Sequence, residues 1–216
     1  MKTSIIIPAR YGSSRYRGKP LVKILGKEMV IRVADICNKI KNVKVFIATD
    51  SKKIANVVKK YGYKYIFTSS SCLTGTDRVA EASKKIRSKI YINVQGDEPT
   101  INPKDIRKVI ETKKKFPNHV VCGYDKVHDF ENPSNINLPK VVVNSKGELI
   151  YISRALVPGK KKESQKIQYH KQVCIYAFNK KQLKKFYSMK KKSETESFED
   201  IEILRFFDLN EKIKMV

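Results

Sequence analysis

The sequence predicts an α/β fold with a doubly wound, mainly parallel sheet. Short apolar runs rich in β-branched residues alternate with amphipathic stretches over residues 3–124, and this alternation is typical of parallel strands joined by crossover helices. The chain has 216 residues and an apolar fraction of 41%. That length and composition suit one sizeable globular domain, so residues 1–216 are predicted to form a single domain.

The expected elements follow one another along the first half of the chain. Runs of β-branched apolar residues predict strands, and apolar residues spaced three and four apart predict helices that face a core. Polar residues at helix starts and glycine at helix ends supply caps, as at Ser51 and Gly62. The predicted strands are 3–8, 43–48, 64–68, 90–94 and 120–124, and the predicted helices are 28–41, 52–61, 76–85 and 103–115.

The pattern changes after residue 124. Residues 125–178 contain three prolines and short strands at 140–143, 149–151 and 173–178, which predicts an inserted, hairpin-rich lobe packed on the main sheet. Such a lobe is expected to form a dimer contact. The remaining sequence predicts a helix at 180–189, a polar break at 190–195, a helix at 198–209 and a strand from 213.

The net charge of +25 raises the question of a nucleic-acid partner. Lysines outnumber arginines by 37 to 9 and lie on nearly every predicted helix, which favours a lysine bias on solvated faces. The sequence has no Arg-rich arm, zinc finger or aromatic RNA-binding motif, so no specific nucleic-acid partner is expected. A basic nucleic-acid-binding protein is kept as a lower-ranked alternative.

Three further features bear on location. No run of about 18 apolar residues is present, so no membrane insertion is expected. The N-terminus leads directly into the first strand without a signal segment. The four cysteines are scattered singly, which argues against a disulfide framework or a metal knuckle and predicts a cytoplasmic protein.

The loop after the first strand is the richest in candidate ligand-binding groups. Residues 9–20 contain two glycines, two serines, three arginines and one lysine, a set suited to a polyphosphate. A loop at the carboxyl end of such a strand is where α/β sheets bind ligands. It is no Walker A loop, because Gly12 and Gly18 are six apart and Lys19 precedes Pro20. The alternative is an ordinary basic surface loop.

A second candidate follows the strand at 90–94. The turn Gly96-Asp97-Glu98-Pro99 places carboxylates at the same predicted sheet edge as the basic loop. A carboxylate facing a polyphosphate site is well placed to hold Mg²⁺. The alternative is a plain turn, because Gly-Asp and Glu-Pro are common turn pairs.

Three further segments contain possible ligand-binding residues, and each also has a purely structural explanation. The segment 75–78 opens a helix, so its amides could face a ligand or simply be capped. Arg154 could clamp a carboxylate or lie free on the surface. Glu199 and Glu202 share a predicted helix face and could receive sugar hydroxyls; for Glu199 a solvated position is favoured.

Four motifs resemble those of the CMP-Kdo synthetases, the 3-deoxy-manno-octulosonate (Kdo) cytidylyltransferases. They are Ile-Pro-Ala-Arg-Tyr-Gly-Ser-Ser-Arg-Tyr-Arg-Gly-Lys-Pro-Leu (7–21), Gly-Thr-Asp-Arg-Val-Ala-Glu (75–81), Asn-Val-Gln-Gly-Asp-Glu-Pro (93–99) and Ser-Arg (153–154). The resemblance extends from residue 2 to the last residue. It implies a Rossmann-like fold, a homodimer formed through the lobe, and CTP, Mg²⁺ and a Kdo-like sugar acid as partners. The implied product is a CMP-sugar for lipopolysaccharide or capsule synthesis.

The resemblance also assigns residue roles. It implies that the sugar hydroxyl attacks the α-phosphorus of CTP while Arg10, Lys19 and Asp97 act in catalysis, and that Asp97 holds Mg²⁺. The implied nucleotide-binding residues are Pro8, Ala9, Arg10, Ser13, Ser14, Arg15, Lys19 and Arg78, and the implied sugar-binding residues are Gln95, Arg154, Gln172 and Glu202.

Three departures from the family pattern matter. Lys171 and Gln172 stand where the family has Arg-His, and Ile203 stands where it has Gln. These changes leave the sugar open, with 8-amino-Kdo or a sialic-acid-like ulosonic acid as alternatives. The family pattern continues beyond the position of Val216 into a segment with a second metal ligand, so Asp97 alone is assigned to the metal here. A catalytically impaired nucleotide-binding homologue is therefore a further alternative.

Overall fold

The computed structural model describes residues 2–12, 16–162 and 164–216. Its central sheet has the strand order β11-β7-β10-β6-β1-β4-β5. β10 runs antiparallel to its neighbours β6 and β7, and the other pairs in this order are parallel. These strands are β1 (Thr3–Ala9), β4 (Val43–Thr49), β5 (Lys64–Phe67), β6 (Ile90–Val94), β7 (Val120–Lys126), β10 (His170–Phe178) and β11 (Ile213–Met215). The predicted doubly wound, mainly parallel sheet is confirmed.

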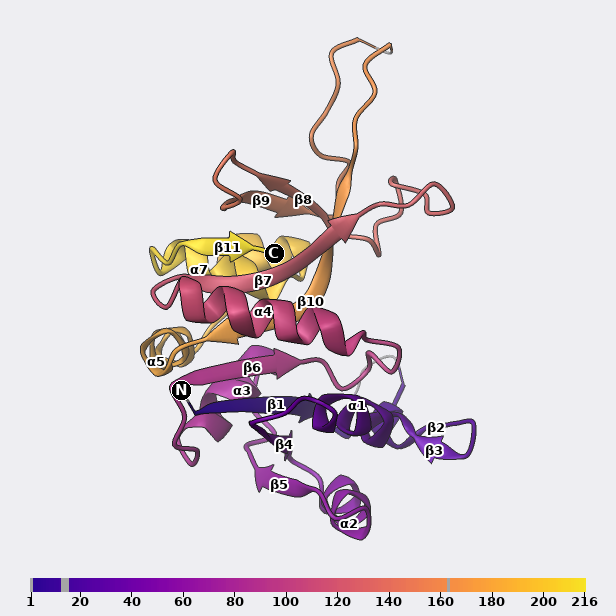
Figure 1. Ribbon diagram of the computed structural model, residues 1–216, viewed down its shortest axis with the longest axis vertical. Helices are drawn as coiled ribbons and strands as arrows, with labels where there is room; N and C mark the ends of the chain where they lie inside the picture. Colours follow the sequence, from indigo (N-terminus) through magenta and orange to yellow (C-terminus); the bar gives the residue numbers. More distant parts are fainter. Residues whose placement is uncertain (1, 13–15, 163) are drawn as a thin grey trace.

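Helices cover both faces of this sheet (Figure 1). Successive residues of β1 show the two layers: Ile5 and Ile7 belong to the core beneath α1, α2 and α4, while Ile6 belongs to the core beneath α3 and α5. A parallel strand buried on both faces explains the continuous apolar run. The helices are α1 (Met29–Asn38), α2 (Lys52–Lys60), α3 (Gly75–Ser83), α4 (Pro103–Lys115) and α5 (Lys180–Ser188).

The lobe is continuous with the main sheet. β8 (Lys140–Val143) and β9 (Leu149–Ser153) form an antiparallel pair, and β8 joins the sheet through a Lys140–Lys171 pairing with β10. The hairpin lies at one end of the molecule, with β5 and α2 at the other (Figure 1). The strand predicted at 173–178 therefore belongs to the middle of the main sheet as well as to the lobe. It is longer than predicted because its first residues pair with β7.

The chain after α5 differs from its prediction. Ser193 and Glu196 form a reciprocal capping box that starts α6 (Glu194–Glu199) inside the predicted polar break. Asp200 then adopts a left-handed conformation, with φ of 49°, which ends the helix. The predicted helix at 198–209 is thus wrong. Its place is taken by the 3₁₀ turn η2 (Glu202–Leu204) and the short helix α7 (Arg205–Asp208).

Two smaller differences lie near the predicted site. The cap of α3 is Thr74, whose hydroxyl accepts the Asp77 amide while the Asp77 side chain accepts the Thr74 amide. The helix therefore starts one residue earlier than predicted. A small hairpin of β2 (Lys23–Ile24) and β3 (Lys27–Glu28) follows the 3₁₀ turn η1 (Lys19–Leu21) and was not predicted. Among the described residues, every helix is too short or too polar to cross a membrane.

Candidate active site

The carboxyl ends of three neighbouring strands form the site. β1 lies between β4 and β6 and is parallel to both. The loops that leave these strands therefore meet at one sheet edge, as open α/β sheets require of a ligand site. They contribute the basic loop after Ala9, the segment that begins at Asp50, and the turn at 95–98.

The base of the basic loop is closed by one backbone hydrogen bond. The amide of Gly18 donates to the carbonyl oxygen of Tyr11 at 2.8 Å. Gly18 has a φ of 78°, and a Cβ there would lie 3.3 Å from the Tyr11 ring, so glycine suits both the backbone and the space. Arg10 and Lys19 flank this closure directly in the sequence, so their positions depend on it.

The basic loop meets the acidic turn, as the sequence predicts. The Nζ atom of Lys19 lies 2.5 Å from Oδ2 of Asp97. The two side chains are 42% and 46% exposed, so both can reach a ligand at this edge. A Cβ at Gly96 would lie only 2.7 Å from the carbonyl oxygen of Pro8, which shows that the turn packs directly on the end of β1.

The other predicted nucleotide-binding residues lie around this contact or outside the described residues. Pro8 and Ala9 are buried at the end of β1, and Arg10 is exposed immediately after it. The predicted donors Ser13, Ser14 and Arg15 fall outside the described residues.

A metal at this edge would have one principal protein ligand. In the described ranges, no three His, Cys, Asp or Glu side chains are grouped to hold a metal ion. Asp97 offers a single accessible carboxylate. Burial and the neighbouring Asp97 raise the pKa of Glu98, while Lys19 opposes this shift. One carboxylate beside a cationic loop fits Mg²⁺, which commonly takes one or two carboxylates together with substrate phosphates and water.

Two of the predicted sugar-binding residues lie together at the start of α3. The Glu202 carboxylate accepts hydrogen bonds from the backbone amides of Gly75 at 3.2 Å and Thr76 at 2.7 Å. The Gln95 side-chain amide donates to the same carboxylate at 3.5 Å. Burial raises the pKa of Glu202, and the helix amides oppose that shift. A Cβ at Gly75 would lie 3.0–3.2 Å from these two side chains, so the backbone approaches them closely.

A buried charge network supports this helix start and was not predicted. The Arg205 guanidinium lies 2.9 Å from the Asp77 carboxylate and 2.6 Å from that of Glu196. Arg205 and Glu196 are fully buried, and Asp77 is 6% exposed. Because Asp77 also caps α3, the network fixes the helix end that holds Glu202. The acidic residues near 194–200 were the available signal, but their partner was not evident from the sequence.

Arg78 is buried rather than open at the sheet edge. Its Nη2 lies 3.0 Å from the Asp50 carboxylate, and its Nη1 donates to the Thr68 hydroxyl at 2.5 Å. The Arg78 side chain is 2% exposed. Its predicted role toward the nucleotide remains a prediction.

Arg154 is held by the lobe and the end of α6. Its guanidinium donates to the carbonyl oxygens of Ile136, Glu199 and Asp200. The Glu199 carboxylate accepts the Ser153 hydroxyl at 2.5 Å and the Arg154 amide at 2.7 Å. The expectation that Glu199 is simply solvated is therefore wrong, because it anchors the end of β9. The role of Arg154 toward the sugar acid remains a prediction.

Gln172 lies where β10 passes from the lobe to the main sheet. Its side-chain amide donates to the Tyr176 hydroxyl at 3.0 Å. The adjacent Lys171 contacts both carboxylate oxygens of Glu131 at 2.5 Å. Lys171 and Gln172, which replace the Arg-His of the family pattern, thus have hydrogen-bonding partners of their own within this chain.

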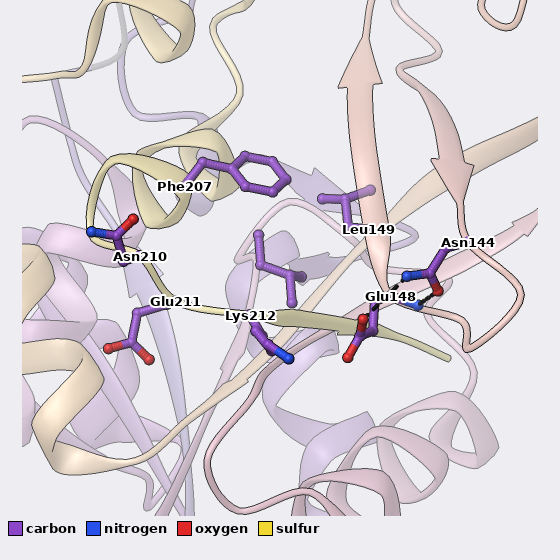
Figure 2. A pocket seen from close by; sticks show the side chains of 8 residues that line it. Asn144, Glu148, Leu149, Phe207, Asn210, Glu211 and Lys212 are labelled. Carbon is purple, nitrogen blue, oxygen red and sulfur yellow. Dashed lines mark hydrogen bonds between the residues drawn. The ribbon is translucent and has the colours of Figure 1, made fainter.

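A separate cavity of about 300 Å³ lies away from these residues (Figure 2). It opens beside the start of β11, at the amino end of a strand parallel to β7, whereas the predicted site lies at carboxyl ends. None of the predicted site residues that the structure describes lines it. The lining residues are Asn144, Glu148, Leu149, Phe207, Asn210, Glu211, Lys212 and Ile213.

Comparison with known proteins connects this geometry to a family. The cytidylyltransferase family model matches residues 4–213. The 3-deoxy-manno-octulosonate cytidylyltransferase of Escherichia coli is 36% identical over 99% of this chain and 86% of its own length. This chain belongs to the cytidylyltransferase family. The same enzyme of Rickettsia felis is 39% identical to this cytidylyltransferase over 93% of the chain and 82% of the relative.

Solved structures agree with the fold of this cytidylyltransferase. A CMP:2-keto-3-deoxy-manno-octonic acid synthetase complexed with CTP superposes with a TM-score of 0.92 at 35% identity, covering 100% of this chain and 89% of the other. A 4-diphosphocytidyl-2C-methyl-D-erythritol synthase from Anaerococcus prevotii has a TM-score of 0.61 at 19% identity, covering 100% of this chain and 88% of the other. The second likeness concerns the fold alone. The predicted membership and the Rossmann-like fold are confirmed.

Proposed function

We propose that this cytidylyltransferase transfers a cytidylyl group from CTP to 3-deoxy-manno-octulosonate or a closely related sugar acid. The observation that carries the proposal is the meeting of Lys19 and Asp97 across the edge formed by β1 and β6. It places a cation for phosphate beside a carboxylate for a metal. The names of the similar proteins, which specify CTP and this sugar acid, support the choice of substrates.

The reaction is an in-line displacement at phosphorus. A hydroxyl oxygen of the sugar acid forms a bond to the α-phosphorus and loses its proton to solvent. The bond from that phosphorus to the oxygen that bridges to the β-phosphate breaks, and pyrophosphate leaves. Arg10 and Lys19 would bind the triphosphate and stabilise the charge that develops on pyrophosphate. Because both residues flank the Tyr11–Gly18 hydrogen bond, their backbone is held at the same sheet edge before the substrate arrives.

Asp97 would hold Mg²⁺, which when bound neutralises phosphate oxygens and helps to orient the reacting groups. Its carboxylate also forms an ion pair with the Lys19 ammonium. Lys19 can therefore move between Asp97 and a phosphate oxygen while it remains at the same sheet edge.

Gln95, Glu202, Gln172 and Arg154 form the proposed sugar side. The first two already share a hydrogen bond at the start of α3, where an amide and a carboxylate can bind sugar hydroxyls. Gln172 and the apolar Ile203 replace polar residues of the family pattern. The preferred sugar could therefore be Kdo, its 8-amino derivative or a sialic-acid-like acid, and the experiment below compares the three.

We further propose that the protein works as a homodimer through its lobe. Three apolar lobe residues are well exposed, namely Ile136 at 65%, Ile150 at 55% and Leu156 at 42%. A subunit interface through the lobe would cover this apolar surface. A cytoplasmic location is also proposed. The four cysteines are free thiols, which is the usual state in a reducing compartment.

The direct test is turnover. The protein is incubated with CTP, Mg²⁺ and each of the three sugar acids, and pyrophosphate and the CMP-sugar are measured by a coupled assay and mass spectrometry. We expect product with at least one acid, and we expect Lys19→Met to lower kcat/KM for CTP by about 100-fold. Lys23→Met, on the exposed β2 strand, is the matched control.

Two results would contradict the proposal. Thermal stabilisation by CTP without product from any acid would indicate a nucleotide-binding homologue without turnover. Equal kcat/KM for CTP in the Lys19 and Lys23 variants would show that Lys19 of the basic loop does not act in catalysis.

A further inference from the structure

We propose that Asp50 is a positioning residue for the basic loop, and that Arg78 acts on the nucleotide through Asp50. The inference rests on the proposed function, because it concerns how the CTP-binding loop is held. Among the described residues of the loop, Tyr11 is the one that hydrogen-bonds Asp50. The contact is made by the backbone of Tyr11.

Asp50 joins the loop to the rest of the sheet edge. Its Oδ1 accepts the amide of Tyr11 at 3.2 Å, and its Oδ2 lies 3.0 Å from Nη2 of Arg78. The side chain of Asp50 is 14% exposed. One carboxylate thus connects the end of β4, the first turn of α3 and the first residues after β1.

Arg78 fixes the orientation of that carboxylate from the interior. Its Nη1 donates to the hydroxyl of Thr68 at 2.5 Å, and the Thr68 amide donates to the carbonyl oxygen of Thr49 at 2.9 Å. The guanidinium is therefore held on two sides within the protein. A guanidinium that is 2% exposed and already paired in this way is suited to orienting a neighbour.

Tyr11 passes this restraint to the cations. Its amide is fixed by Asp50, and its carbonyl oxygen closes the loop by accepting the amide of Gly18. Arg10 precedes Tyr11, and Lys19 follows Gly18. If the Tyr11 backbone is no longer held by Asp50, the backbone that carries both cations can shift. Misplacement of a binding group by even about 1 Å can reduce the rate strongly.

The test is Asp50→Asn. An amide has one acceptor oxygen, so it can serve Tyr11 or Arg78 but not both. The CTP dissociation constant is measured by calorimetry without sugar acid, and steady-state kinetics give KM for each substrate. We expect the dissociation constant for CTP to rise about tenfold, while KM for the sugar acid changes by less than about twofold.

Asp35→Asn controls for a simple loss of stability. The carboxylate of Asp35 on α1 likewise accepts hydrogen bonds from a lysine and a hydroxyl, Lys27 at 2.7 Å and Tyr63 at 2.5 Å. Within the described part of the chain it makes no hydrogen bond to the basic loop. We expect this variant to melt at a lower temperature with an unchanged CTP dissociation constant. If both variants weaken CTP binding equally, Asp50 has no positioning role.

A double-mutant cycle tests whether Arg78 works through Asp50. If it does, the double variant Arg78→Gln/Asp50→Asn has a CTP dissociation constant no higher than that of the single variant with the lower affinity. Additive losses would show that Arg78 affects CTP binding independently of Asp50 and would overturn that half of the proposal. Thr68→Val serves if Asp50→Asn does not fold. It removes one partner of Arg78 and is expected to weaken CTP binding about threefold.

The outcome for the proposed function is separable. Wild-type protein that binds CTP but forms no CMP-sugar would overturn the proposed turnover while the comparison of dissociation constants still decides the role of Asp50. Wild-type protein that does not bind CTP, or an Asp50→Asn variant with wild-type affinity, would overturn the positioning role.

Discussion

At Gly96 the turn after β6 packs tightly against the end of β1. A Cβ there would lie 2.7 Å from the Pro8 carbonyl oxygen and 3.4 Å from the Ile7 side chain. The nearest atom is backbone, which cannot rotate away. Gly96→Ala must therefore push the turn from β1, and the displacement extends to the adjacent Asp97.

We predict that Gly96→Ala lowers the free energy of unfolding by about 1–3 kcal/mol. It should also reduce kcat/KM for CTP, because Asp97 leaves the position where it meets Lys19. Urea denaturation and steady-state kinetics provide the measurements. Gly159→Ala is the control, since a Cβ there has no atom within 4 Å; similar behaviour of both variants would refute the close-contact explanation.

At the scale of elements, the start of α3 depends on a charge network contributed by the C-terminal helices. Arg205 pairs with Asp77 and Glu196 in the interior, and its guanidinium also lies 3.8 Å from the centre of the Phe186 ring. Removing the cation would leave two buried carboxylates without their partner. Breaking a buried ion pair on one side is strongly destabilising.

Arg205→Met is therefore expected to lower the free energy of unfolding by about 3–5 kcal/mol. KM for the sugar acid should rise as well, because the amides of the disturbed helix start hold the Glu202 carboxylate. The exposed Arg107 on α4 gives the control Arg107→Met, for which a change within about 0.5 kcal/mol is expected. Equal effects of the two substitutions in chemical denaturation would contradict the role of the network.

The pairing of the lobe strand β10 with the loop after β7 predicts a pH dependence. The hydrogen bond from Lys171 lowers the pKa of Glu131 below its ordinary value of 4.5, and the His128 amide adds to this effect. Since the folded pKa is the lower one, the ion pair stabilises the fold above about pH 4.5. That contribution is lost as the pH falls through the folded pKa.

Glu131→Gln should accordingly cost about 1 kcal/mol at pH 7 and have a smaller effect at pH 3. Thermal melts between pH 3 and pH 7 measure both quantities. Asp129→Asn, which alters an exposed neighbour, should leave the pH dependence of the wild type unchanged. A constant difference between Glu131→Gln and wild type across this range would rule out the ion pair as its cause.

At the scale of the whole molecule, local patterns predicted the elements better than their partners. Alternation in the first 124 residues predicted β1, β4, β5 and β6 and the edge where Lys19 meets Asp97. The insertion of β10 between β6 and β7 was missed, because its pairings, such as Ile175 with Val94, join distant segments. Arg205 and Asp77 were likewise missed, since they are 128 residues apart. Periodicity indicates which residues are buried but not which distant residue they meet.

The exposed apolar side chains of the lobe lead to the last prediction. Ile150 lies on β9 and is 55% exposed, beside Tyr151 at 36%. A subunit interface through the lobe would remove such exposed apolar side chains from water. If the lobe is the proposed dimer contact, a charge introduced on β9 should separate the protomers.

We therefore expect light scattering after size-exclusion chromatography to give the mass of two 24.9 kDa chains for the wild type and of one for Ile150→Glu. Burying an unpaired carboxylate in an apolar interface is strongly unfavourable. Leu25→Glu is the matched control, because Leu25 is 92% exposed in the β2–β3 hairpin, outside the lobe. A monomeric wild type would refute the dimer, and dissociation caused by Leu25→Glu instead would move the interface away from the lobe.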